Sequence, residues 1–183
     1  SGVTLTNNAA LGSDSGAITN AGTINSNADN IKGTVANSGS LNLSGGTLNK
    51  AVSGNGTTTI SGNTTNNAGI NQGVNVNSGV TLTNNAALGS DNGKITNAGT
   101  INTNANNIKG AVTNNNTVNL SGGTLSKAIS GSGTTNITGI VSSNSAISQA
   151  ISIASAGDLT VSASNVGGNV TNAGDLILNG GTL

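Results

Sequence analysis

The chain has 183 residues with five cations, all lysine, and five anions, all aspartate, so its formal net charge is zero. Histidine, cysteine, methionine, proline and every aromatic residue are missing. This composition excludes histidine acid–base catalysis, soft metal sites, disulfides and aromatic stacking on bases or sugars, and it provides no long-range field toward nucleic acid. We therefore expect no enzymatic activity, no cofactor and no nucleic-acid partner.

Hydropathy along the chain also limits its class. No stretch approaches the ~20 consecutive apolar residues of a membrane helix, so we expect no membrane insertion by this segment. The chain begins in the middle of a repeated pattern. This start indicates a fragment of a longer array, whose targeting signal would lie outside it.

A long repeat organises the chain. The segment SGVTLTNNAALGSDSGAITNAGTIN from Ser1 returns with few changes from Ser78, and a divergent copy starts at Ser155. Most exchanges between copies preserve polarity, as Val52 with Ile129 does. A fixed period is typical of solenoids. We predict one continuous β-solenoid over 1–183, with copies over 1–77 and 78–154 and a partial copy over 155–183.

A shorter period lies within each copy. Segments such as ITNAGTI and VANSGSLNL restart with Ile or Val at a nearly constant step, as Ile18 and Val35 do, except for one longer step before Val76. The alternation that follows each restart predicts strands rather than helices. We interpret the long step as a turn with an insertion, in 61–74 and 138–151, which either carries recognition or is a tolerated surface loop. The predicted core ladder is Ile18, Val35, Val52, Val76, Ile95, Val112, Ile129, Ile153 and Val170.

Asparagine and glycine mark the corner after each restart. Both types suit a corner where φ is positive, and stacked asparagines can bond amide to amide along the axis. The predicted corner asparagines, which come shortly after the restart, are Asn20, Asn37, Asn97, Asn114 and Asn172. The predicted corner glycines, which come slightly later, are Gly22, Gly39, Gly56, Gly99, Gly133, Gly157 and Gly174.

The doubled glycine of NLSGGTLNKA is predicted to be another corner. A phosphate-binding loop would need a helix after the glycines, whereas Thr47 and Leu48 continue a strand. A calcium-binding nonapeptide would need an aspartate that does not follow Gly45 and Gly46. The glycines are therefore interpreted as structural.

The few charged and threonine-rich positions allow only weak functional interpretations. Asp158 and Asp175 should occupy one column of adjacent turns, where solvated corner residues are favoured over a paired-carboxylate site. Lys32 and Lys50 should lie on adjacent turns near one edge, either blunting that edge or forming a weak patch for anionic surfaces. Threonine-rich pieces such as TTTI suggest hydroxyl ranks of the kind found in ice-binding β-helices, which is a minor alternative.

Elementary energetics favour stacking of these turns. A single turn of about 17 residues cannot bury enough aliphatic surface to offset its own ordering, whereas turns stacked ~4.8 Å apart pair their backbones and close a continuous core. We predict an all-β parallel β-helix of about ten turns with roughly 17–24 residues each. The columns alone leave its handedness open.

The segments VANSGSLNLSGGTL and VTNAGDLILNGGTL resemble the β-helical passenger repeats of Gram-negative autotransporters and related filamentous surface adhesins. The resemblance spans essentially the whole chain and rests on repeat style rather than on a diagnostic motif. It implies a right-handed parallel β-helix, export to the extracellular bacterial cell surface, and a role in adhesion, auto-aggregation or biofilm formation. Many such passengers contain aromatic stacks, and this chain departs from them in having none.

These observations lead to three expectations of function. The first is a structural and adhesive rod that acts as a repetitive spacer, with itself, a host surface or a neighbouring cell as partner and with the ligand unknown. The second is an extracellular filament or biofilm-matrix protein built by end-to-end stacking, because uncapped strands invite addition. A β-helical carbohydrate-cleaving enzyme is the weakest, because the usual acidic and basic cleft residues have no counterparts.

Overall fold

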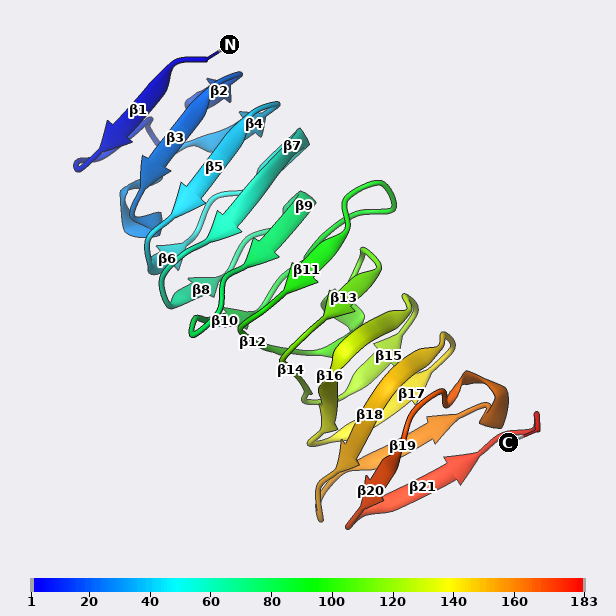
Figure 1. Cartoon of the computed structure of the whole chain (residues 1–183). Helices are drawn as coiled ribbons and strands as arrows, with labels where there is room; N and C mark the ends of the chain where they lie inside the picture. The colour runs from blue at the N-terminus through cyan, green and yellow to red at the C-terminus, as the bar shows by residue number, and fades with distance from the viewer. Residues whose placement is uncertain (1, 183) are drawn as a thin grey trace.

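The computed structural model describes residues 2–182 as a β-solenoid of about ten coils, which confirms the predicted all-β parallel fold. Figure 1 shows the coils stacked along one axis with the two termini at opposite ends. Every strand pairing in this range is parallel. The strands are β1 (Thr4–Asn7), β2 (Ala17–Asn20), β3 (Thr23–Ser26), β4 (Thr34–Asn37), β5 (Ser40–Leu43), β6 (Gly46–Leu48), β7 (Val52–Ile60), β8 (Thr64–Asn66), β9 (Ile70–Val76), β10 (Thr81–Asn84), β11 (Ile95–Asn97), β12 (Thr100–Thr103), β13 (Val112–Asn114), β14 (Thr117–Leu120), β15 (Gly123–Leu125), β16 (Ile129–Ile137), β17 (Ile140–Ser143), β18 (Ile147–Ile153), β19 (Asp158–Val161), β20 (Val170–Asn172) and β21 (Asp175–Leu178).

Each coil has three faces, and each face is a stack of parallel strands that pair from coil to coil. Face A begins with β2 and β4, face B with β1, β3 and β5, and face C with β6, β8 and β10. Inward side chains alternate with outward ones along every strand, as the pleat requires. The inward aliphatic residues, such as Leu41, Leu43 and Ile60, are fully buried and form one core along the axis.

The coils are more even in length than the sequence period suggested. Register partners are closest in sequence at pairs such as Thr57 and Gly73, and farthest apart at Val74 and Ile95. The supposed insertions 61–74 and 138–151 do not bulge from the solenoid, because they contribute to strands β8, β9, β17 and β18. The inward residue Val74 is fully buried, as is Ile70. The extra residues of the long sequence step therefore form part of a regular coil and do not make a loop outside it.

One repeat is not a whole number of coils. Four coil steps on face A connect Ile18 through Val35, Val52 and Ile70 to Leu88. The sequence counterpart of Ile18 in the second copy is Ile95, which comes later than Leu88 by about the length of one face. Ile95 consequently lies on face B. There it stacks on Val74 rather than in the column of Val52.

This rotation divides the predicted ladder into three columns, which are Ile18, Val35 and Val52 on face A, Ile95, Val112 and Ile129 on face B, and Val170 on face C. The other two members, Val76 and Ile153, lie in none of these columns. Val76 pairs with Ile60 and Asn97, and not with Val52 and Ile95. Ile153 pairs with Ile137 and Asn172, and not with Ile129 and Val170. Both predictions were wrong because they assumed that equal sequence positions share one column. The neighbours of Val52 and Ile129 in the next coil are Ile70 and Ile147.

Three short 3₁₀ helices show how the copies are spaced. They are η1 (Ala28–Asn30), η2 (Ala105–Asn107) and η3 (Ala163–Asn165), and each has a buried alanine as its first residue. Ala28 and Ala105 are separated by one full repeat, whereas Ala163 follows Ala105 after less than one. In this part of the chain, the third copy thus follows the second at a spacing shorter by about one coil.

Candidate functional site

The inward asparagines form buried amide ladders, as predicted. Asn20 Nδ2 donates to Asn37 Oδ1 at 2.7 Å, and Asn97 Nδ2 donates to Asn114 Oδ1 at 2.7 Å. The Oδ1 of Asn20 also accepts from the backbone N–H of Gly22 at 3.1 Å, which fixes the corner. Asn172 is exposed, and its side chain makes the corner bond to Gly174 N at 3.1 Å.

A glutamine ends each of these two ladders. Gln72 replaces a three-residue corner, because residues 54–56 of β7 lie opposite Gln72 alone in β9. In the orientation that satisfies both amide atoms, its oxygen accepts from Asn37 Nδ2 at 2.9 Å and from Thr58 Oγ1 at 2.7 Å. Gln149 does the same for Asn114 and Thr135. These residues were missed from the sequence, although the only two glutamines occupy the same position of the first and second copies.

The corner glycines serve close backbone approach rather than positive φ. None of the seven predicted corner glycines has a left-handed backbone, so the predicted reason was wrong. A Cβ built on Gly174 would overlap the carbonyl oxygen of Gly157 in the preceding coil, and one on Gly56 would overlap that of Gly39. Asn116 replaces glycine at one such corner of the second copy, so a small shift accommodates a Cβ there.

The doubled glycine is a corner that does have left-handed backbone. Gly45 and Gly46 have φ values of 125° and 90°, which side-chain-bearing residues rarely adopt. Asp29 Oδ1 accepts from the following Thr47 N at 2.8 Å, while its counterpart Asn106 Oδ1 accepts from Thr124 N at 2.9 Å. Because only an acceptor oxygen is used, aspartate and asparagine are interchangeable here.

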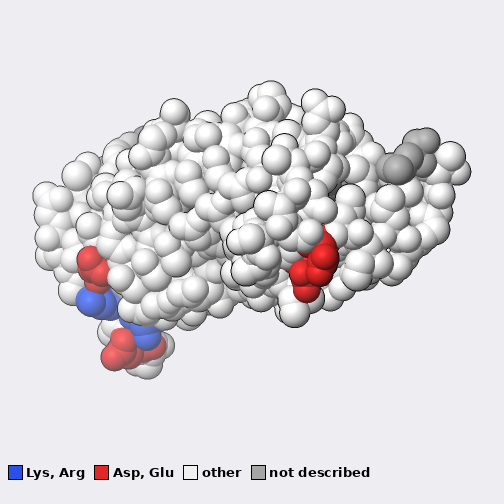
Figure 2. Space-filling view, turned by 90° about the horizontal axis from the view of Figure 1, so that it is seen from below, with Lys and Arg blue, Asp and Glu red and all other residues white. Residues whose placement is uncertain are grey.

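Two exposed ion pairs recur between the copies. Asp14 Oδ1 lies 2.9 Å from Lys50 Nζ, and Asp91 pairs with Lys127. The Lys50 hydrogen bond and charge, with a smaller contribution from Lys32, lower the pKa of Asp14. Lys127 lowers the pKa of Asp91 in the same way. Figure 2 shows how sparse charge is on the view it presents, where most of the surface is neutral.

The remaining aspartates take the predicted positions. Asp158 and Asp175 are register partners on β19 and β21, so they occupy one column of adjacent coils. Among residues 2–182, no group of three or more aspartate side chains is placed to hold a metal ion. Within the same range, no helix is long and apolar enough to cross a membrane.

Outward side chains form ranks of hydroxyls and amides. One rank on face B runs over nine coils with a threonine, serine or asparagine at every position: Thr6, Asn25, Asn42, Thr59, Asn75, Thr96, Thr113, Ser130 and Ser148. No charged side chain interrupts this rank. Its members are half-buried or exposed, so their polar groups are available to a partner.

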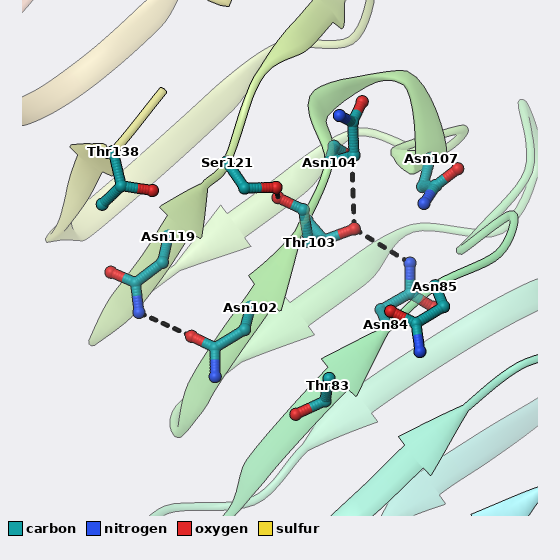
Figure 3. A pocket seen from close by; sticks show the side chains of 10 residues that line it. All are labelled: Thr83, Asn84, Asn85, Asn102, Thr103, Asn104, Asn107, Asn119, Ser121 and Thr138. Carbon is teal, nitrogen blue, oxygen red and sulfur yellow. Dashed lines mark hydrogen bonds between the residues drawn. The ribbon is translucent and has the colours of Figure 1, made fainter. Parts of the chain in front are cut away.

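A groove on face C has the same chemistry. Figure 3 shows Asn102 and Asn119 on its strand side, with Asn119 Nδ2 donating to Asn102 Oδ1 at 2.6 Å. Elsewhere in the groove, Thr103 Oγ1 accepts from Asn84 Nδ2 at 3.0 Å. All ten lining residues are Ser, Thr or Asn. The groove can offer hydrogen bonds to a neutral ligand but no charge or aromatic surface.

Comparisons with known proteins return no relationship. No protein-family model matches the chain, no curated protein matches it, and no solved structure matches it.

Proposed function

We propose that this chain is a structural and adhesive rod of a bacterial cell-surface adhesin, a repetitive spacer that also supports adhesion or auto-aggregation. The observation that carries the proposal is the uninterrupted stack of parallel coils around one aliphatic core. In such a stack each coil contacts only its neighbours, so length grows simply by adding coils. The absence of histidine and cysteine and the low charge favour a non-catalytic role.

The proposed binding mode is lateral contact through the outward rank on face B. Its hydroxyl and amide groups both donate and accept, so the rank of one rod is complementary to the rank of another. Zero net charge removes the repulsion that would otherwise separate identical rods. The partner is then a second copy on a neighbouring cell, or a host surface with similar hydrogen-bonding groups.

The test uses cells or beads that display the chain. We expect them to aggregate, and we expect Asn75→Asp with Thr113→Asp to abolish aggregation, because like charges then meet across the contact. The matched control carries the same added charge at Asn92→Asp and Ser126→Asp, which are exposed but outside the rank. Equal loss in both variants, or no aggregation of the parent chain, would contradict the proposal.

End-to-end assembly is the second candidate. Parallel pairing in every coil supports it, because a terminal strand presents the same backbone groups that pair inside the stack. Electron micrographs at increasing protein concentration distinguish the two. Rods that lengthen with concentration indicate a filament, whereas rods of constant length that join side by side indicate lateral contact.

A further inference from the structure

Two outward ranks run side by side over four coils of face C. The first contains Thr81, Thr100, Thr117 and Thr134, and the second contains Thr83, Asn102, Asn119 and Asn136. The register is unshifted from β10 through β12 and β14 to β16 in these pairings. The eight side chains, called the face C grid below, therefore form straight rows along the axis and along the strands.

The spacing of the grid follows from β-sheet geometry. Neighbouring coils place the rows ~4.8 Å apart, and alternate residues on a strand lie ~6.6 Å apart. Hydrogen bonds hold the asparagine row in place, since Asn119 Nδ2 donates to Asn102 Oδ1 at 2.6 Å and Asn136 Nδ2 to Asn119 Oδ1 at 2.8 Å. All eight residues are half-buried by their neighbours. The asparagine row is therefore ordered before any ligand arrives, which lowers the entropy cost of binding.

The chemistry of the grid fits ordered water better than a sugar or a charged polymer. Hydroxyls and amides both donate and accept, and each threonine also carries a methyl group. The grid contains no charged side chain, so it suits neither an anionic nor a cationic polymer. The chain has no aromatic residue on which a sugar ring could stack. The class of ligand that the grid still fits has regularly repeated donors and acceptors and is bound through ordered waters.

We infer that the face C grid binds ice, by ordering a layer of water in rows that merge with the crystal lattice. The inference goes beyond the adhesive rod and does not depend on it. Polar groups that repeat in rows can align several waters at once in the same repeating pattern.

The first copy supplies a second grid. Its rows are Thr4, Thr23, Ser40 and Thr57 beside Thr6, Asn25, Asn42 and Thr59. Because each copy is rotated by one face, this grid lies on face B and is not a continuation of the face C grid. Asn42 Nδ2 donates to Asn25 Oδ1 at 2.7 Å, so the same internal bond orders it. The molecule thus presents two grids in two directions.

The experiment measures thermal hysteresis, ice-crystal shape and partition of the purified chain into slowly growing ice. The parent chain should shape crystals and enter the ice. Thr100→Tyr with Thr117→Tyr should lower the hysteresis at least twofold, and adding Thr23→Tyr with Ser40→Tyr should abolish it. The matched control is Ser142→Tyr with Thr160→Tyr, two outward register partners on adjacent coils of face A that lie outside both grids and the face B rank and are flanked on their strands by Ile140 and Asp158.

The outcomes are decisive in either direction. Unshaped crystals and exclusion of the parent chain from ice overturn the inference, as does equal loss in the control. Circular dichroism checks folding, and if the tyrosine variants misfold, Thr117→Lys provides a strongly hydrated charge on a flexible stem instead. Retention of the parent chain on insoluble cellulose or chitin, lost in the grid variants without any effect on ice, would assign the grid to a polysaccharide and overturn ice binding.

Discussion

The two copies of the repeat have nearly the same sequence but face different directions. Ile18 starts a column on face A, whereas its counterpart Ile95 lies on face B and stacks on Val74. The copies keep the same internal contacts, including the amide ladder, the glutamine cap and the ion pair. The difference teaches that a sequence period and a structural period are separate quantities, linked only through the number of residues per coil.

Engineered disulfides test the rotation between the copies, because each introduced cysteine pair either forms a bond or stays reduced. The chain has no cysteine, so a pair can be introduced cleanly. Asn75 and Thr96 are register partners, and we expect Asn75→Cys with Thr96→Cys to form a disulfide, because adjacent strands meet the Cα distance requirement. Asn77→Cys with Thr96→Cys, the pair expected if the copies shared columns, should stay reduced. Mass spectrometry after mild oxidation distinguishes the two, and the opposite pattern would restore the unrotated register.

Valine in place of a corner glycine should give the next largest effect, and a similar one in both copies. A Cβ at Gly133 would overlap Asn116 O and crowd Asn114 Nδ2, as one at Gly56 would crowd Asn37 Nδ2. We expect Gly133→Val and Gly56→Val each to cost about 3 kcal/mol in free energy of unfolding. Val52→Ile, an exchange already present as Ile129, should cost less than about 1.5 kcal/mol. Chemical denaturation measures all three, and a costlier Val52→Ile would invalidate the corner assignment.

Removal of the glutamine caps tests the buried ladders. Gln72→Leu removes the acceptor of the buried Thr58 hydroxyl and one of the acceptors of the Asn37 amide, which keeps its bonds to Gly39 O and Thr57 O. We expect a loss of about 2 kcal/mol, the usual cost of an unsatisfied buried polar group, and a matching loss for Gln149→Leu. Thermal and chemical denaturation measure both. Combining Gln72→Leu with Asn37→Leu should cost less than the sum of the single changes, and additive losses would show that the two side chains are not coupled.

The ion pairs should have the smallest effect, visible only in acid. The folded pKa of Asp14 and of Asp91 is lowered from 3.8 by lysine partners, so each pair stabilises the fold above that pH and loses its contribution as the pH falls below it. We expect Asp14→Asn with Asp91→Asn to flatten the acid limb of the melting-temperature profile and to change the neutral value little. Salt should have the same effect on the parent chain, because both pairs are exposed.

Much of the fold was predictable because every coil repeats the same pattern of buried aliphatic and polar residues. Alternating aliphatic residues indicated the strands, and recurring asparagines such as Asn20 and Asn37 indicated the ladder. The column of Val76 was not predictable in the same way, because β9 shortens a three-residue corner to Gln72 and moves the register. Sequence spacing cannot distinguish a long coil from an additional face. The reason why glycine is needed at these corners also required coordinates, because the sequence does not show which carbonyl oxygen of the preceding coil a Cβ would meet.

The one-face rotation has a consequence for how such a rod can vary in length. If further copies repeat the same geometry, three of them complete about thirteen coils before an equivalent side chain points the same way again. Gain or loss of a single copy by recombination would keep the coils stacked and the core intact. It would, however, turn everything beyond that point by about a third of a revolution about the axis. The number of copies would then set both the length of the rod and the direction about its axis in which the surface of its far end faces.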